Sequence, residues 1–249
     1  MTAADAGYRR YDYKTALLDG IFSRLGDRDL QVLDLGSGTS KDFVEVLRRY
    51  PRARYTGVEF RESRLARARE LLAGYPGVEL VSGFGEDVQA GWADRFDLTV
   101  SLSVLEHVKH LRDFLRSSVR VTRPGGWVVH RYDLGHALHS GPYETTKVFL
   151  CKRFPALMPA RHFTTHPDVR RVVSLLEEAG VEVRAVTHAQ LPDLKQMMNR
   201  LDWDAPGSAE LAREAIELDA RLAERMQGRI EHREMERFFP TITVEGVKR

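Results

Sequence analysis

The stretch Val32-Leu33-Asp34-Leu35-Gly36-Ser37-Gly38-Thr39-Ser40 decides how this chain folds. Its apolar run carries one acidic residue and breaks into a Gly-x-Gly turn, after which a helical pattern runs from Asp42 to Tyr50. Glycine tolerates positive φ and has no Cβ, so a ligand can lie against bare backbone at such a turn. The N-terminus of the next helix adds N–H groups that have no helical partner. The stretch therefore predicts a strand, a ligand-binding turn and a helix.

Strands and helices are predicted to alternate on both sides of this turn. The expected strands are Leu30–Leu35, Tyr55–Glu59, Val78–Val81, Phe96–Leu102, Trp127–Tyr132, Val181–Val186 and Ile242–Val247. The expected helices are Tyr13–Leu25, Asp42–Tyr50, Arg61–Ala73, Leu105–Val121, Asp168–Ala179 and one that begins at Ser208. This order predicts an α/β fold, a mostly parallel sheet with helices on both faces, whose ligands bind beyond the carboxyl ends of the strands.

Three segments fall outside the alternation and are expected to form a cap. At 249 residues the chain is expected to be a single domain, with a core of about 27–134, 167–189 and 238–249. The cap or substrate segments are then about 1–26, 135–166 and 190–237. The last segment contains the helix that Ser208 is expected to cap, with apolar residues from Leu211 to Ile230 on one stripe. We interpret that stripe as a packing surface, over the active site or against a second subunit.

Composition excludes several classes of protein. The net charge is +2 and basic residues are scattered among acidic ones, so a nucleic-acid partner is not expected. One cysteine, Cys151, rules out an internal disulfide framework and a cysteine zinc cluster. No run approaches the roughly 20 apolar residues that span a bilayer. We expect a cytoplasmic protein without a membrane partner, and a homodimer is possible.

Four motifs in order resemble class I S-adenosylmethionine-dependent methyltransferases of the Rossmann-like group, over about residues 30–132. They are Val32-Leu33-Asp34-Leu35-Gly36-Ser37-Gly38, Gly57-Val58-Glu59-Phe60, Phe96-Asp97 through Val104-Leu105-Glu106-His107-Val108, and Arg123-Pro124-Gly125-Gly126. The segment Ile242–Lys248 resembles the seventh, antiparallel strand of that family. The resemblance implies a seven-stranded sheet of order 3-2-1-4-5-7-6 and S-adenosylmethionine as the cofactor.

The resemblance also assigns the cofactor contacts. Asp34 would hold the ammonium group, and Glu59 would accept both ribose hydroxyls, since a carboxylate can take two donors at once. The remaining implied cofactor residues are Gly36, Ser37, Gly38, Phe60, Ser101 and Leu102. One position departs from the family, because Phe84 stands where an acid usually meets the adenine amine. Gly85 and Glu86 are the expected substitutes for that contact.

Alternatives to a small-molecule methyltransferase stay open at this point. A nicotinamide dehydrogenase would need a third glycine where this chain has Lys41, and an aminopropyl transferase would need an acidic polyamine channel. A methyltransferase acting on RNA or protein, or a protein that binds the cofactor without turnover, is also compatible with the motifs. The favoured function is methyl transfer to an O, N or C nucleophile of a small acceptor, in specialised metabolism.

Catalysis and acceptor binding are expected around the ends of the fourth and fifth strands. Methyl transfer needs alignment above all, and a base only where the acceptor carries a proton. Base candidates are Glu106, His107, His130, Tyr132, Asp133, His136 and His139, of which we favour His107, His136 and His139. Tyr11, Tyr13, Tyr132 and Tyr143 are the expected acceptor-binding residues. The long connection Gly135–Pro167 is interpreted as a lid over the acceptor, and no metal is expected.

Overall fold

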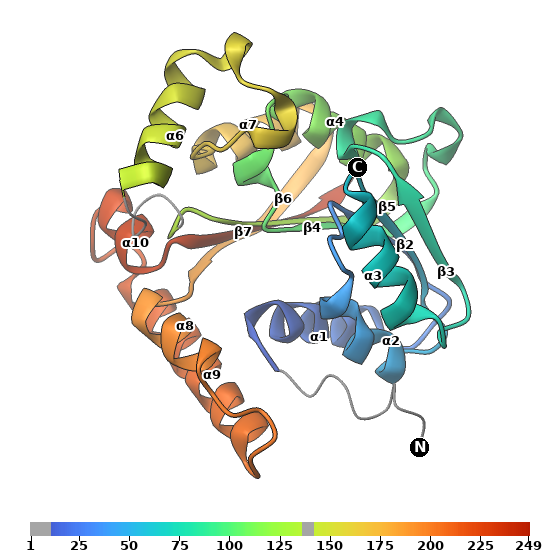
Figure 1. The fold of residues 1–249 in the computed structure, drawn as a ribbon, viewed down its shortest axis with the longest axis horizontal. Coiled ribbons are helices and arrows are strands. Elements are labelled where there is room, and N and C mark those ends of the chain that lie inside the picture. Colours follow the sequence, from blue (N-terminus) through green and yellow to red (C-terminus); the bar gives the residue numbers. More distant parts are fainter. Residues whose placement is uncertain (1–10, 136–141) are drawn as a thin grey trace.

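A computed structural model describes residues 11–135 and 142–249 and shows a seven-stranded sheet in the order β3-β2-β1-β4-β5-β7-β6 (Figure 1). The strands are β1 (Gln31–Leu35), β2 (Arg54–Glu59), β3 (Val78–Ser82), β4 (Phe96–Leu102), β5 (Thr122–Asp133), β6 (Val181–Ala189) and β7 (Thr241–Lys248). Only β7 runs antiparallel to its neighbours, β5 and β6. The expected fold class and strand order are confirmed.

The strand order reverses beside β1, which pairs with β2 on one side and β4 on the other. The chain moves outward from β1 to β2 and β3 and then returns to place β4 against the other edge of β1. Loops leaving β1 and β4 therefore diverge, and a crevice opens above the carboxyl ends of these strands. The Gly-x-Gly turn lies at this crevice because it follows β1 directly.

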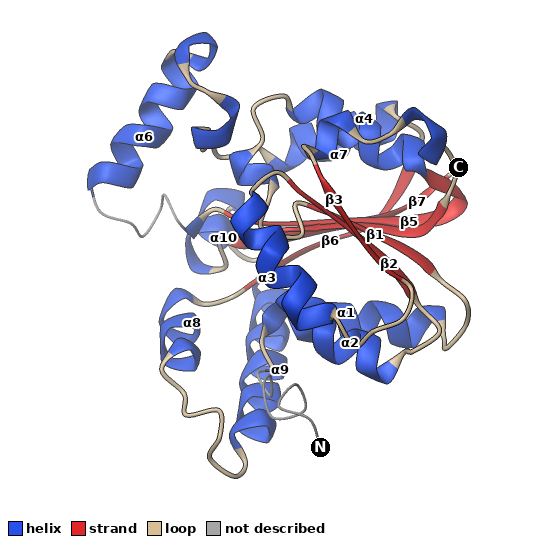
Figure 2. Ribbon diagram, turned by 45° about the vertical axis from the view of Figure 1, so that its right-hand side comes forward, coloured by secondary structure: helices blue, strands red, loops and turns tan. Residues whose placement is uncertain are grey.

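Helices cover both faces of the sheet (Figure 2). On one face lie α1 (Tyr13–Leu25) and α2 (Val44–Arg49), and on the other lie α4 (Leu111–Val121) and α7 (Val169–Glu178). Each face buries its own apolar cluster: Phe22 of α1 contributes to the first, and Phe114 of α4 to the second. The apolar strands β1 and β4 contribute to both clusters, which explains why they read as nearly continuous apolar runs. α3 (Glu62–Leu72) packs along β2 and β3.

The helix expected over Leu105–Val121 is interrupted. A 3-10 turn covers Leu105–His107, Val108 is extended, and α4 begins only at Leu111. The carbonyl of Glu106, which a continuous helix would offer to His110, accepts the Thr165 N–H instead at 2.7 Å. A long-range hydrogen bond thus replaces the helical one, and a sequence pattern carries no sign of it.

The predicted helix after residue 207 exists as α9 (Ser208–Met226), but its start and its packing differ from expectation. Gly207 takes the N-cap position in a left-handed conformation, and the Ser208 hydroxyl donates to the Asp202 carbonyl instead of capping the helix. Leu211, Leu218 and Leu222 of the apolar stripe are exposed, while the buried side chains of α9 are Ser208, Ala212, Asp219 and Ala223. The stripe is therefore used for packing only at its C-terminal end, where Met226 and Ile230 pack against Ala223, Met235 and Phe239.

The irregular segments form further helices outside the sheet. They are α6 (Pro142–Arg153), α8 (Pro192–Asn199) and α10 (His232–Phe238). In Figure 1, α6 lies apart from the sheet at the upper left, and α8 and α9 extend from the sheet at the lower left. Among the described helices, none has the length and apolar character that crossing a membrane requires.

Candidate active site

A cavity of about 650 Å³ lies at the carboxyl ends of β1, β2 and β4. The Gly-x-Gly turn forms one wall of this cavity. The N–H groups of Gly36 and Ser37 hold the turn beside β2 by donating to the Val58 carbonyl at 2.8 and 2.9 Å. Gly36 has φ of +78°, and a Cβ there would lie 2.7 Å from a methyl group of Val104. Only glycine fits both the conformation and the space, so the turn keeps its backbone open to the cavity.

Glu59 fixes the shape of this wall from the end of β2. Its side chain is buried, and its two oxygens accept the N–H of Gly38 at 3.1 Å and the N–H of Arg61 at 2.9 Å. The carboxylate therefore holds the glycine turn against the start of α3. A carboxylate oxygen can accept more than one donor, so Glu59, which also lines the cavity, retains acceptor capacity for a ligand's hydroxyl groups.

Asp34 places a buried acidic group at the floor of the cavity. Its Oδ2 accepts the Tyr55 hydroxyl at 3.0 Å, whereas its Oδ1 is buried and has no hydrogen-bond partner among the described residues. Burial raises the pKa of Asp34 to about 7, with Asp42 and Glu59 adding repulsion and Lys14 opposing it. An unsatisfied carboxylate oxygen that lines a cavity suits a cationic donor from a ligand.

An aromatic pair stands where the adenine contact was expected. The rings of Phe60 and Phe84 stack at 4.8 Å between centroids and 12° between planes, and both line the cavity. Gly85 is buried under Phe114, whose ring would lie 2.3 Å from a Cβ at that position. Burial raises the pKa of Glu86, which lines the same wall. The packing of Phe84 on Phe60 was not predicted from the sequence.

Of the two residues on β4 that were expected to contact the cofactor, one lines the cavity and the other lies in the core. Leu102 lines the cavity, but Ser101 is fully buried with its hydroxyl 2.8 Å from Nδ1 of His130. Nε2 of the same imidazole lies 3.0 Å from the Ser118 hydroxyl, and burial lowers the pKa of His130 to about 3. His130 is thus a neutral, doubly hydrogen-bonded core residue. Its buried position does not suit the base role that was considered for it.

The other expected catalytic residues are scattered. His107 lines the cavity, with Nδ1 at 3.4 Å from the Thr164 hydroxyl. Glu106 is buried, accepts the Asp133 N–H at 3.4 Å and has its pKa raised to about 8 by burial, but it lines neither cavity described here. His136 and His139 lie outside the described residues.

The four expected acceptor-binding tyrosines do not converge on one site. Tyr132 is fully buried in the apolar core, which disagrees with the expected contact, and Tyr143 on α6 is 77% exposed. Tyr11 lies against Arg213 of α9, whose guanidinium is 4.6 Å from the ring centre. Only Tyr13 lines a cavity, and it does so in a second one.

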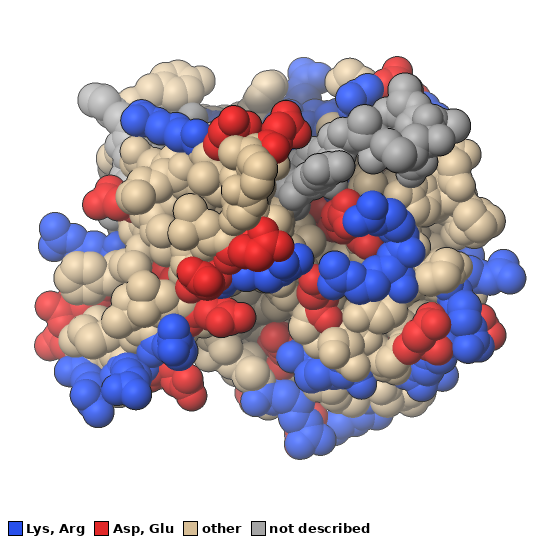
Figure 3. Space-filling model, turned by 90° about the horizontal axis from the view of Figure 1, so that it is seen from below, with Lys and Arg blue, Asp and Glu red and all other residues tan. Residues whose placement is uncertain are grey.

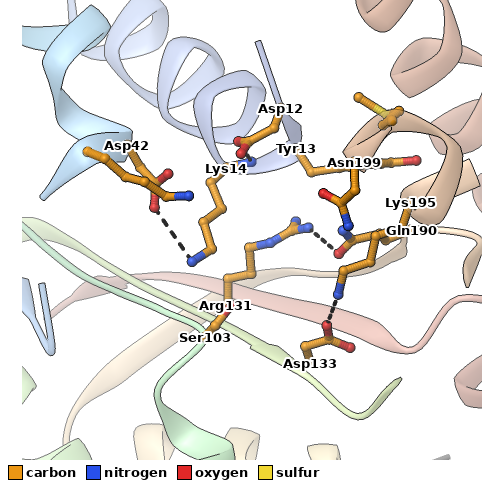
Figure 4. Close-up of a pocket in the computed structure, with 12 residues that line it drawn as sticks. Asp12, Tyr13, Lys14, Asp42, Ser103, Arg131, Asp133, Gln190, Lys195 and Asn199 are labelled. Atoms are coloured by element: carbon orange, nitrogen blue, oxygen red, sulfur yellow. Dashed lines mark hydrogen bonds and ion pairs between the residues drawn. The ribbon is translucent and has the colours of Figure 1, made fainter. Parts of the chain in front are cut away.

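The second cavity, of about 300 Å³, adjoins the first and is rich in charge (Figure 4). Its wall comprises Asp12, Tyr13, Lys14, Lys41, Asp42, Ser103, Arg131, Asp133, Gln190, Lys195, Met198 and Asn199. Four of these residues, namely Lys14, Lys41, Asp42 and Ser103, also line the larger cavity. The two spaces therefore share a wall.

Most of the charges in this second cavity are engaged with one another. Nζ of Lys14 lies 3.5 Å from the Asp42 carboxylate, and Lys195 of α8 forms an ion pair with Asp133 at the end of β5. The guanidinium of Arg131 donates to the amide oxygen of Gln190 at 3.1 Å. Among the residues of this cavity, only Tyr13 and the base candidate Asp133 were predicted from the sequence. The one available signal for Arg131 was a basic residue inside an apolar strand.

No cluster of three or more histidine, cysteine, aspartate or glutamate side chains is arranged for a metal ion within residues 11–135 and 142–249. The donor set of the larger cavity instead suits an organic cation with hydroxyl groups. An open glycine backbone, the unpartnered Asp34 oxygen and the acceptor capacity of Glu59 match the methionine, ammonium and ribose parts of S-adenosylmethionine.

Comparison with known proteins agrees with this fit. A family described as "Methyltransferase domain" matches residues 33–128, which run from β1 through the glycine turn and into β5. No curated protein matches the sequence. The structure resembles phosphoethanolamine N-methyltransferase 2 of Haemonchus contortus, solved with S-adenosyl-L-methionine, at a TM-score of 0.61 and 14% identity, over 94% of this chain and 52% of that one.

Two further solved structures show how much chemistry this fold carries. Geranyl diphosphate C-methyltransferase from Streptomyces coelicolor A3(2), solved with S-adenosyl-L-homocysteine, matches at a TM-score of 0.60 and 12% identity, over 95% of this chain and 79% of that one. The [4+2]-cyclase SpnF matches at 0.58 and 16% identity, over 97% and 84%. At such identities the likeness establishes the fold alone.

The match to a methyltransferase domain over residues 33–128 and the strand order of the sheet are features of the class I S-adenosylmethionine-dependent methyltransferases. S-adenosylmethionine is the methyl donor of that family, and solved neighbours contain it or its demethylated product.

Proposed function

We propose that this methyltransferase acts on a small polar molecule held in the charged cavity. The observation that carries the proposal is the shared wall: Lys14, Lys41, Asp42 and Ser103 border both the cavity suited to the cofactor and the smaller, charged one. A donor in the first cavity and an acceptor in the second would therefore lie next to each other, where these four residues border both cavities. Holding two reactants in this way supplies a large part of the acceleration that methyl transfer needs.

The residues of the larger cavity would hold the donor. Asp34 would receive the ammonium group on its unpartnered oxygen, and Glu59 would accept the ribose hydroxyls. The stacked Phe60 and Phe84 would offer an apolar wall to the adenine ring. The glycine turn would let the methionine part lie against its backbone.

The size and composition of the second cavity support a small, polar acceptor. Its volume of about 300 Å³ is near the lower end of small-molecule sites, and most of its lining residues are charged or polar. A long polymer would need an open basic face instead. Basic and acidic side chains are interspersed on the face that Figure 3 shows.

An acceptor nucleophile that carries a proton needs a base close to the shared wall. Asp133 lines the charged cavity as a buried carboxylate beside Lys195, and His107 lines the larger cavity. Of the two, Asp133 lies on the acceptor's side of the wall, and we assign it the role of accepting that proton. An acceptor without a titrating proton needs only alignment.

Methyl transfer from radiolabelled S-adenosylmethionine tests this function. The protein is incubated with a cell extract that has been separated into small molecules, RNA and protein. We expect label only in the small-molecule fraction, with a loss for Glu59→Ala and none for Glu62→Ala, which changes an exposed residue at the start of α3. Label confined to RNA or protein would contradict the proposal, as would binding of the donor without transfer to any fraction.

A further inference from the structure

The charged cavity contains one buried cation that lacks a carboxylate partner among the described residues. Arg131 lies near the end of β5 with only 4% of its surface exposed, and it lines the cavity. Within residues 11–135 and 142–249, its one hydrogen-bond acceptor is the amide oxygen of Gln190, and no carboxylate lies within ion-pair distance of its guanidinium. Buried charges in proteins are normally paired, so an anion that entered the cavity would stabilise this guanidinium.

The carboxylates that act electrostatically on Arg131 make their hydrogen bonds and ion pairs with other groups. Asp133 pairs with Lys195 and accepts the Gly135 N–H, and Asp219 of α9 accepts the N–H groups of Gln190 and Leu191 at 2.6 and 2.8 Å. Asp12 caps α1 by accepting the N–H groups of its first turn. These acidic groups attract Arg131 from a distance without making contact with it.

Gln190 orients the guanidinium without neutralising it. Its amide oxygen accepts both Nη2 of Arg131 at 3.1 Å and the Thr241 hydroxyl at 2.6 Å. Gln190 has a φ of +77°, which is costly for a residue with a side chain, and the two backbone hydrogen bonds to Asp219 stabilise it there. A strained neutral residue therefore presents the charged fork of Arg131 to the cavity (Figure 4).

We propose that Arg131 binds an anionic group of the acceptor, a carboxylate or a phosphate, a proposal that rests on the function proposed above. The cavity has four basic side chains, Lys14, Lys41, Arg131 and Lys195, against three acidic ones, Asp12, Asp42 and Asp133, so a single anion balances it. The planar guanidinium matches carboxylate and phosphate groups through two parallel hydrogen bonds. The anion would anchor the acceptor in the charged cavity and so select acidic acceptors.

A binding titration that needs no knowledge of the acceptor tests this proposal. The protein loaded with S-adenosylhomocysteine is titrated with sodium acetate, inorganic phosphate and acetamide at constant ionic strength, and binding is followed by NMR shifts. We expect saturable binding of acetate or phosphate and no binding of acetamide. The anion that binds more tightly identifies the anionic group of the acceptor as a carboxylate or a phosphate. Arg131→Gln should weaken that binding at least about tenfold, whereas Arg184→Gln, on the exposed part of β6, should leave it unchanged.

Gln190→Glu provides a second variant, because Arg131→Gln alters a buried position and its fold must be checked by thermal melting. The new carboxylate would form an ion pair with the Arg131 guanidinium, which Gln190 already contacts. We therefore expect a folded protein that no longer binds the added anion. Equal anion binding in wild type and both cavity variants would overturn the proposal, and so would no anion binding in wild type. S-adenosylhomocysteine binding in the same samples separates this failure from a failure of the proposed function.

Discussion

We expect Asp34 to make cofactor binding depend on pH. Burial raises its pKa in the folded protein to about 7, so the folded chain retains a proton that the unfolded chain releases near pH 4. The contribution of Asp34 to the free energy of unfolding therefore falls as pH rises from about 4 to about 7. A ligand ammonium group at its unpartnered oxygen prefers the ionised form, so ligand affinity should change in the opposite direction.

We predict that the dissociation constant of S-adenosylhomocysteine tightens as pH rises from 5.5 to 7 and levels off above, with a limiting slope of about tenfold per pH unit. Calorimetric titration across this range measures it. Asp34→Asn should bind more weakly and without this pH dependence, since its side chain stays neutral. Glu106→Gln is the matched control, because Glu106 is also buried with a raised pKa but lines neither cavity. The same slope in Asp34→Asn would remove Asp34 from the ammonium contact.

Glu59 combines two roles that a substitution should separate. Glu59→Ala loses the proposed acceptor of the ribose hydroxyls and should weaken S-adenosylhomocysteine binding by roughly 1.5–3 kcal/mol, about tenfold or more. It also loses the hydrogen bonds from the Gly38 and Arg61 N–H groups, so the melting temperature should fall somewhat. Glu62→Ala removes only an exposed pair with Arg69 and should change neither quantity. An unchanged affinity in folded Glu59→Ala would move the ribose contact elsewhere.

At the level of secondary-structure elements, the charged cavity, where we propose that the acceptor binds, is lined by residues of α1, the end of β5 and α8. The long segment Gly135–Pro167 was expected to bind the acceptor, but its described residues that line a cavity, Lys147 and Ala160–Phe163, border the larger one. α8 supplies Lys195, Met198 and Asn199 to the charged cavity instead.

We therefore predict that α8 and α6 respond differently to substitution. With the acceptor found by the fractionation assay, Asn199→Ala and Met198→Ala should raise KM several-fold while leaving the affinity for S-adenosylhomocysteine unchanged. Tyr143→Phe on α6 should leave KM and kcat as in wild type, because its side chain is exposed and lines neither cavity. The reverse pattern, with an effect only at Tyr143, would support the prediction that the segment forms a lid over the acceptor.

The sheet and the glycine turn could be predicted because they depend on local patterns. Apolar runs such as Phe96–Leu102 define strands, and Gly36 and Glu59 stand at fixed places relative to their strands. The break before α4 could not be predicted, since it depends on a hydrogen bond from Thr165, far along the chain. The charged cavity was missed for the same reason: Lys14, Arg131 and Lys195 come together only in the fold.

For the whole molecule, the site favours a cofactor with an ammonium group over a dinucleotide. Asp34 and Glu59 place two carboxylates at the turn, where the pyrophosphate of a dinucleotide would need positive charge or free N–H groups. We predict that calorimetry gives a saturable titration with S-adenosylhomocysteine and no heat with NAD. Tight binding of NAD without a response to S-adenosylhomocysteine would contradict the assigned cofactor.

A crystal structure of the complex with S-adenosylhomocysteine tests most directly whether donor and acceptor meet across the shared wall. We predict that the ribose hydroxyls lie on Glu59 and that the sulfur lies beside Ser103 and Lys14, with its open side toward Arg131. A sulfur directed toward His107 and Arg161, which line only the larger cavity, would contradict this account, because the methyl group would then point away from the charged cavity.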